Sequence, residues 1–127
     1  MIIGIPREIK PEERRVSVTP EGVKRFLTHG HQILIEQKAG EGCGISDSAY
    51  RKAGCTIKAS SNAVWGKADM VIKVKEPLPV EIPQMREEQV LFTFLHLAAN
   101  RHLTYYNHLR LTSDSPCPWG VPPFSLG

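Results

Sequence analysis

The chain has 127 residues, of which 41% are hydrophobic and 23% charged, with ten glycines and ten prolines. This composition is typical of one globular domain, and folding at this length buries roughly two thirds of the extended chain's surface, so a core can form without disulfides or metal. Sixteen basic and 13 acidic residues give a formal net charge of +3. That balance is too even for a surface that follows nucleic-acid phosphates, and we expect no nucleic-acid partner.

Three cysteines, Cys43, Cys55 and Cys117, lie far apart and are odd in number. They indicate neither a closed set of disulfides nor a zinc site with paired ligands, and they favour a reducing, cytoplasmic setting. No apolar run approaches the roughly 20 residues of a membrane helix. The charged residues after the first apolar run are unlike a signal peptide. We therefore expect no membrane partner and a mature chain that starts where the sequence starts.

The first part of the chain alternates short apolar runs with helix signals. The β-branched run at residues 2–5 predicts a strand, and the charged stretch at 7–15 predicts a surface loop after it. Thr19 is suited to cap a helix that stops at Gly30. Residues 31–36 then predict a second apolar strand.

The same alternation continues as far as residue 94. The further predicted elements are a helix from the Ser46 cap to Ala53, a strand at 55–57, a helix from Ser60 or Ser61 to about Trp65, a strand at 70–74, a helical stretch at 82–87 and a strand at 90–94.

Alternating strands and helices predict an α/β fold, a Rossmann-like open parallel sheet with helices on both faces. Asn100 is suited to cap one further helix. The proline-, glycine- and serine-rich stretch at 112–127 cannot sustain a helix or a central strand. We interpret it as a weakly ordered tail, with the alternative that Trp119 and Phe124 fold back onto an apolar patch. The predicted division is a domain over 1–111 followed by this tail.

Mixed charges run from Arg7 to Arg15, directly after the first predicted strand. Ligands of open α/β sheets bind at the carboxyl ends of strands, and the planar fork of arginine can donate two parallel hydrogen bonds to a carboxylate. Arg15 is therefore a candidate ligand for a carboxylate. The alternative is that the whole run is a solvated loop.

Lys73 interrupts the apolar run of the strand predicted at 70–74, and Lys75 follows directly after that strand. A lysine in an apolar strand is costly unless it is paired or faces a wet cleft. Alternatively, either lysine guards a sheet edge against aggregation. Lys75 is the stronger site candidate because it is nearer the strand end, and contact of Lys73 with a ligand is left open.

His96 interrupts the apolar segment 91–98, just after a predicted strand. A single buried histidine is more often a hydrogen-bonded core residue than a catalyst. However, three strand ends that each deliver one ionisable group favour a shared crevice. In this hypothesis Arg15 and Lys75 hold a carboxylate, and His96 titrates near neutrality as acid or base.

Two other motifs are weaker. Residues 40–44 (GEGCG) resemble a glycine-rich phosphate loop, but Ile45 stands where G-x-G-x-x-G requires its third glycine, so a tight turn is predicted. His29 and His31 have a poor spacing for a metal, and no ligand completes a site, so no metal is expected.

One set of segments, taken together, is more specific than any single motif. They are residues 1–10 (MIIGIPREIK), 13–16 (ERRV), 19–23 (TPEGV), 40–42 (GEG), 69–77 (DMVIKVKEP) and 91–99 (LFTFLHLAA). Over residues 1 to about 104 the sequence resembles the amino-terminal domain of the alanine dehydrogenase and pyridine nucleotide transhydrogenase family. The transhydrogenase α-subunit shares the opening motif, whereas the Lys-Glu-Pro and histidine segments favour alanine dehydrogenase.

The resemblance implies NAD-dependent, reversible oxidative deamination of L-alanine to pyruvate and ammonia. In that family the residues matching Arg15 and Lys75 hold the carboxylate and carbonyl end of the substrate. The histidine matching His96 is the acid–base group at the reacting oxygen. The implied partners are L-alanine or pyruvate and, because family enzymes are commonly oligomers, further copies of the chain.

The sequence departs from the family pattern after the matched segments. Family enzymes continue into an NAD-binding domain and then return to finish the substrate domain, but these 127 residues contain no glycine fingerprint and no acidic ribose ligand for it. We therefore expect an incomplete substrate domain, from a truncated or frame-shifted product, with uncovered apolar surface. The alternatives are an inactive fragment that binds a small carboxylate or pairs with a full-length subunit, and a transhydrogenase-like N-terminal piece.

Overall fold

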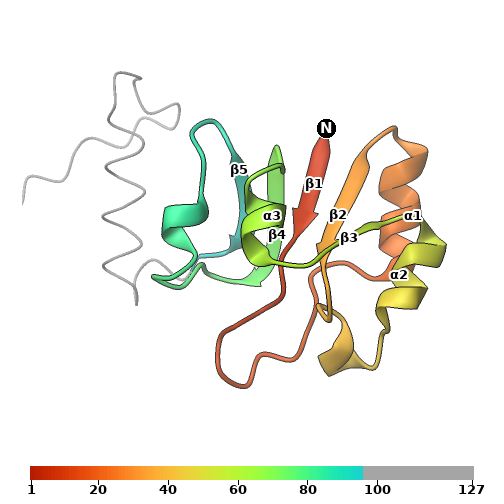
Figure 1. Ribbon diagram of the computed structural model, residues 1–127, viewed down its shortest axis with the longest axis horizontal. Coiled ribbons are helices and arrows are strands. Elements are labelled where there is room, and N and C mark those ends of the chain that lie inside the picture. The colour runs from red at the N-terminus through yellow and green to blue at the C-terminus, as the bar shows by residue number, and fades with distance from the viewer. Residues whose placement is uncertain (96–127) are drawn as a thin grey trace, which may run out of the picture. The chain divides into compact units, whose positions relative to one another are not determined.

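Five strands of the computed structural model form one parallel sheet in the order β3-β2-β1-β4-β5 (Figure 1). The structure describes residues 1–95, which form one compact unit. The elements are β1 (Ile2–Ile5), α1 (Pro20–Thr28), β2 (Gln32–Glu36), the 3-10 turn η1 (Glu41–Cys43), α2 (Asp47–Ala53), β3 (Thr56–Lys58), α3 (Ser61–Trp65), β4 (Met70–Lys75), the 3-10 turn η2 (Ile82–Gln84) and β5 (Val90–Phe94).

The strand order reverses beside β1, because the chain moves outward through β2 and β3 and then crosses back through α3 to β4. Parallel crossovers are right-handed, so this reversal places α3 on the face opposite α1 and α2. The packing agrees, since α1 contacts α2, whereas α3 contacts β1, β2 and β3. The predicted open parallel sheet with helices on both faces is confirmed.

The helix termini are formed by the cap residues that the sequence indicates. The side-chain oxygens of Thr19, Ser46 and Ser60 each accept a hydrogen bond from the backbone N–H three residues later, at the starts of α1, α2 and α3. Gly54 ends α2 in the left-handed conformation, with φ of 108°. These helices therefore begin and end close to their predicted positions.

The larger core lies between the sheet and the pair α1 and α2. Ile3 and Ile5 lie two residues apart on β1, so both face this side of the sheet. They pack in one buried cluster with Val23 of α1 and Tyr50 of α2. The Tyr50 hydroxyl donates to the carbonyl oxygen of Val18 at 2.8 Å, so its polar end is satisfied. This cluster fixes β1 and the segment that leads into α1.

A second core lies on the α3 face and depends on Gly4. A Cβ atom at this position would lie 2.7 Å from the Cβ of Ala68 and 2.8 Å from Cγ1 of Val64, so only glycine lets α3 approach β1 so closely. Trp65 and Val71 are fully buried in the same layer. The two faces of the central strands are therefore both covered.

Two elements differ from the predicted ones. The stretch at 82–87 is not a helix, because after the turn at Ile82–Gln84 the chain becomes extended at Met85. The Arg86 guanidinium donates to the carbonyl oxygens of Trp65 and Ala68, which ties this segment to the end of α3. The strand predicted at 70–74 extends to Lys75, which is its last residue and not part of the following loop.

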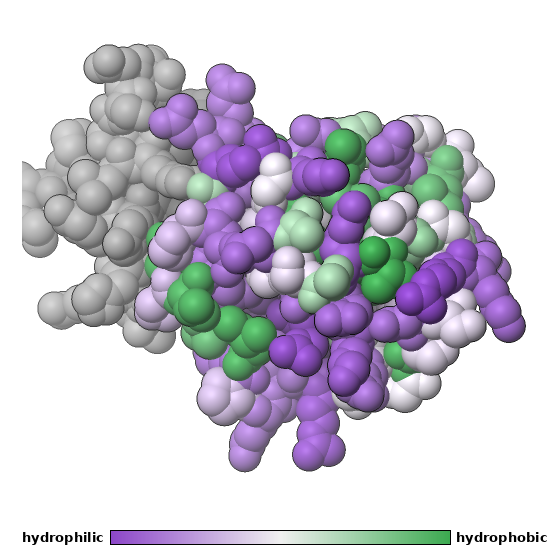
Figure 2. Space-filling view, in the orientation of Figure 1, coloured by the Kyte–Doolittle hydropathy of each residue, from purple (hydrophilic) through white to green (hydrophobic). Residues whose placement is uncertain are grey.

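No helix within residues 1–95 is long and apolar enough to cross a bilayer. Hydrophilic side chains predominate on the face shown in Figure 2, with only small hydrophobic patches between them. The predicted helix after Asn100, the tail at 112–127 and the boundary between the two lie outside the described residues.

Candidate functional site

Two site candidates come from neighbouring strands at the point where the strand order reverses. Arg15 lies in the loop between β1 and α1, and Lys75 ends β4, which pairs with β1. In open α/β sheets the carboxyl ends of strands at such a reversal are the usual place for a ligand. The topology therefore brings these two segments to one edge of the sheet.

Arg15 is held on one edge by Glu13. Its Nε donates to Oε1 of Glu13 at 2.9 Å and its Nη2 to Oε2 at 2.7 Å, which is a bidentate pair. The Arg15 side chain is 64% exposed, whereas that of Glu13 is 6% exposed. The guanidinium is thus fixed by a covered carboxylate on one side and open to solvent on the other.

The charges of Arg15 and Lys75 both act on the carboxylate of Glu13. The side-chain hydrogen bond from Arg15 lowers the pKa of Glu13 to about 2 against the opposing effect of burial, and the Lys75 charge adds to the lowering. The same hydrogen bond, which Arg15 donates to Glu13, raises the pKa of Arg15, and the charge of Glu8 contributes to that. Two of the three predicted site residues are therefore electrostatic neighbours of one carboxyl group.

Lys75 is positioned through its backbone by Glu8. Oε1 of Glu8 accepts the N–H of Lys75 at 2.9 Å, and Oε2 accepts the N–H of Val74 at 3.3 Å. β1 pairs with β4 only at Met70 and Val71, so Glu8 supplies acceptors to the part of β4 beyond the end of β1. The loop after β1 thereby fixes the strand end that carries Lys75.

Lys73 has a different environment from Lys75. Its Nζ donates to Oε1 of Glu81 at 2.9 Å and lies 3.5 Å from Oε1 of Glu8. All three side chains are at least 97% covered, with 1% of Lys73 exposed. The interpretation of Lys73 as an exposed edge guard is wrong, because its charge is buried and paired. Sequence reasoning did not identify Glu8 and Glu81 as its partners.

The glycine-rich turn supports the loop that carries Arg15. A Cβ atom at Gly42 would lie 2.5 Å from the carbonyl oxygen of Arg14, and the Cys43 thiol donates to that oxygen at 3.1 Å. Farther along the loop, the Ser17 hydroxyl donates to the carbonyl oxygen of Ile72 in β4 at 2.8 Å. The predicted tight turn is confirmed, and its contact is with protein backbone.

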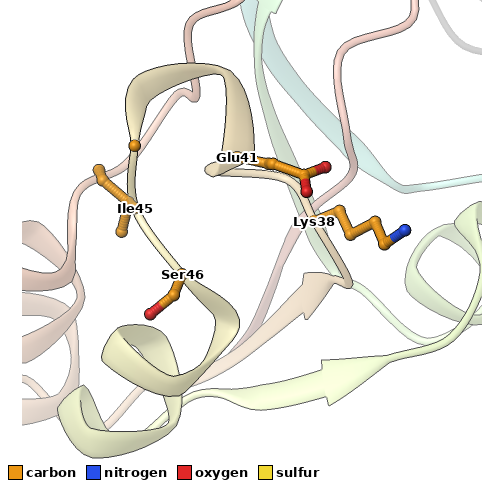
Figure 3. Close-up of a pocket in the computed structure, with 5 residues that line it drawn as sticks. Lys38, Glu41, Ile45 and Ser46 are labelled. Carbon is orange, nitrogen blue, oxygen red and sulfur yellow. The ribbon is translucent and has the colours of Figure 1, made fainter.

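A shallow hollow of about 260 Å³ lies beside the same turn but does not include Arg15 or Lys75. Figure 3 shows the loop curving around it, with Lys38 and Glu41 on one side and Ser46 on the other. Its lining residues are Lys38, Glu41, Gly44, Ile45 and Ser46. A lysine beside a glutamate gives it no preference for ligand charge, and we assign it no ligand.

The remaining ionisable candidates add no further site among the described residues. Residues 1–95 hold no group of three or more His, Cys, Asp or Glu placed to bind a metal ion. The N-terminal amine lies 3.3 Å from Nδ1 of His31. His96, the third predicted site residue, lies outside the described residues.

Comparison with known proteins identifies the family of this chain. The family model described as "Alanine dehydrogenase/PNT, N-terminal domain" matches residues 4–108. The chain belongs to this family. It is 46% identical over 104 residues to the alanine dehydrogenase of Mycolicibacterium smegmatis, covering 82% of this chain and 28% of that protein. It is 52% identical over 103 residues to the alanine dehydrogenase of Bacillus subtilis, covering 81% and 27%.

Solved structures of the alanine dehydrogenase/PNT family share the fold. A structure of an L-alanine dehydrogenase has a TM-score of 0.81 and 46% identity, with 84% of this chain and 29% of that chain covered. A transhydrogenase from Sinorhizobium meliloti has a TM-score of 0.78 and 30% identity, with 84% and 31% covered. The chain is thus an alanine dehydrogenase-like N-terminal domain and spans less than a third of the length of these relatives.

Proposed function

We propose that this domain binds the carboxylate of L-alanine or pyruvate and serves the NAD-dependent, reversible oxidative deamination of L-alanine to pyruvate and ammonia. The supporting observation is that Arg15 and Lys75, from two strand ends at the reversal of the sheet, both act on the carboxylate of Glu13. A substrate carboxylate needs the same pair of cations. The names of the relatives support the proposed reaction, and the closeness of Arg15 and Lys75 to the Glu13 carboxylate supports the choice of binding groups.

Each proposed residue has one task. Arg15 binds the substrate carboxylate through the edge that Glu13 leaves open, and Lys75 binds the carbonyl end. Two fixed cations orient the substrate and stabilise charge on its oxygens. His96 moves the proton at the reacting oxygen, a task assigned from the family resemblance.

NAD is the hydride acceptor in this proposal, and the described residues do not fit it. The turn after β2 lacks the third glycine of a dinucleotide fingerprint, and the space next to Gly42 is taken by the backbone of Arg14. Residues 1–95 therefore lack the fingerprint that would hold NAD. We also propose that the protein acts in the cytoplasm and that several copies of it associate.

The misfit with NAD favours one second candidate, a domain that binds a small carboxylate without turnover. The two candidates predict the same substrate contacts and differ in chemistry. An assay of NADH formation from L-alanine by the 127-residue polypeptide separates them. We expect no NADH from this polypeptide, whereas formation that disappears in His96→Ala would favour the enzyme.

Titration with pyruvate, followed by NMR, tests the binding step. We expect Arg15→Ala to weaken binding by about tenfold or more, because a charge-assisted bidentate contact is lost. Arg25→Ala removes the same charge from the exposed last turn of α1 and is the matched control. Equal pyruvate affinity in Arg15→Ala and the unmodified chain would disprove the proposed role of Arg15.

A further inference from the structure

We infer that Glu13 is a positioning residue for Arg15, holding the Nε–Nη2 edge of the guanidinium so that its Nη1 side faces the substrate carboxylate. This inference rests on the proposed function of Arg15. It concerns a residue that sequence reasoning placed in a solvated loop and that has no part in the reaction itself.

The hydrogen-bonded contact between the Glu13 carboxylate and Arg15 is called the clasp below. The clasp is rigid because Glu13 accepts hydrogen bonds from the backbone of Arg15 as well as from its side chain. Oε1 of Glu13 accepts both the Nε–H of Arg15 at 2.9 Å and the backbone N–H of Arg15 at 2.9 Å. The carboxylate is thus tied to the main chain of the residue whose side chain it holds. With 6% of the Glu13 side chain exposed, neighbouring protein also limits its movement.

The clasp leaves donors for a second carboxylate. A guanidinium has five N–H groups, and the contacts with Glu13 use the one on Nε and one on Nη2. The Nη1 group and the other hydrogen of Nη2 form the end of the fork, which suits a second bidentate carboxylate. The Arg15 side chain is 64% exposed, so an anion can reach this end.

The charge balance also favours a second anion. Glu13 neutralises one positive charge, and the charge of Lys75 also acts on the Glu13 carboxylate. Glu8 lies near Arg15 as well, but its carboxylate is 97% covered and faces Lys73 and the backbone of β4. An incoming carboxylate therefore meets a net positive group that is already oriented.

A competing possibility is that Glu13 is an internal anion that the substrate must displace from Arg15. Displacement would break three hydrogen bonds, one of them to the backbone, and would move a covered side chain. Binding at the open end breaks none of them. The two possibilities predict opposite effects of removing the carboxylate, since loss of a positioning group weakens pyruvate binding and loss of a competitor strengthens it.

The test compares Glu13→Gln with Glu12→Gln in the 127-residue chain. Glu12 is exposed and adjacent, so its variant removes the same charge from the same loop and controls for long-range attraction of an anion. We expect pyruvate affinity to fall about three- to tenfold in Glu13→Gln, because a mobile arginine must then be ordered on binding. Glu12→Gln should bind as the unmodified chain does or slightly more tightly.

A second measurement reports on the clasp without any ligand. The Nε–H signal of Arg15 in ¹⁵N NMR spectra should exchange slowly with water in the unmodified chain and in Glu12→Gln, and rapidly in Glu13→Gln. Circular dichroism and urea unfolding check that Glu13→Gln is folded. A folded variant with unchanged Nε–H exchange would overturn the clasp.

The outcomes separate this inference from the proposed function. If Arg15→Ala abolishes pyruvate binding but Glu13→Gln binds equally well or more tightly, the proposed function stands and the positioning role is wrong. If the unmodified chain binds no pyruvate, or Arg15→Ala binds it equally well, the proposed function fails and the inference fails with it. Weaker binding in Glu13→Gln alone, with faster Nε–H exchange, supports both.

Discussion

Gly42 lies directly against the backbone of Arg14, since a Cβ atom on Gly42 would be 2.5 Å from the Arg14 carbonyl oxygen. The thiol of Cys43 donates to the same oxygen at 3.1 Å. The contact is made by Arg14, the residue before Arg15. The turn after β2 therefore helps to position the backbone from which the Arg15 side chain extends. The glycine-rich turn that resembles a phosphate loop in the sequence thus supports the loop that carries Arg15.

Gly42→Ala should displace the loop that carries Arg15, because a methyl group cannot share space with backbone atoms. We expect pyruvate affinity to fall about tenfold, since small misplacements of a binding group are costly. Gly44→Ala is the control from the same turn. It has open space but φ of 72°, so it should lower the free energy of unfolding by about 1 kcal/mol without changing pyruvate affinity. Equal affinities in both variants would contradict the proposed support.

The ion pair of Glu13 with Arg15 should make stability depend on pH in acid. The pKa of Glu13 is lowered from 4.5 to about 2 in the folded chain. A carboxylate with a lowered folded pKa stabilises the fold above its unfolded pKa, and this contribution is lost as pH falls toward the folded value. Arg15→Gln should therefore reduce stability by a constant amount above about pH 5, and the difference should shrink below that pH.

A ¹³C NMR titration of the Glu13 carboxyl group measures the cause directly. The midpoint should lie at about 2 in the unmodified chain and move toward 4.5 in Arg15→Gln. We expect only a small change in unfolding free energy, because Arg15 is exposed and water screens the pair. An unchanged midpoint in Arg15→Gln would show that another group lowers the pKa.

The order of strands and helices was predictable because local signals set it. Thr19 and Ser46 cap helices in the structure as their positions in the sequence predicted, and Gly54 ends α2 where expected. The stretch at 82–87 was predicted as a helix because its composition permits one. It is not helical because Arg86 bonds to carbonyl oxygens at the end of α3, about 20 residues earlier, which a local pattern does not reveal.

The site was predictable only in part, for the same reason. Arg15 and Lys75 are predictable because they lie after or at the ends of strands that reach the same edge of a parallel sheet, and the strand order agrees with this. The roles of Glu8 and Glu13 were missed because they stand in a run of mixed charges that is typical of solvated loops. Nothing in the run distinguishes Glu8, whose side chain is covered, from exposed Glu12, since the difference comes from β4, more than 60 residues away.

Lys73→Met should strongly destabilise the domain. The substitution leaves the carboxylates of Glu8 and Glu81 buried without the ammonium between them. Breaking a buried ion pair by removing one partner typically costs about 3 to 5 kcal/mol. Urea unfolding measures this loss as a lower transition midpoint.

Lys24→Met is the matched control for Lys73→Met. Lys24 pairs with Glu21 on α1 at 3.6 Å, with both side chains more than half exposed. Such pairs contribute little, so the free energy of unfolding should change by less than about 0.5 kcal/mol. Similar losses in the two variants would contradict the burial of Lys73.

Within residues 1–95, strand β5 has exposed hydrophobic side chains on one face, and we expect these to make the polypeptide self-associate. Val90, Phe92 and Phe94 are 49%, 68% and 74% exposed, and their alternate spacing places them on one face of the strand. Within residues 1–95, β5 pairs only with β4. Exposed apolar patches on an edge strand favour association with another copy.

Sedimentation velocity at increasing protein concentration tests this expectation. The sedimentation coefficient of the unmodified chain should rise with concentration, and Phe92→Ser should reduce that rise because it removes a large side chain from the centre of the face. Ile9→Ser, which changes an exposed apolar side chain in the loop before α1, should leave the rise unchanged. A concentration-independent coefficient for the unmodified chain would mean that the face of β5 attracts no second copy. An equal effect of both variants would assign the association to general surface hydrophobicity and not to β5.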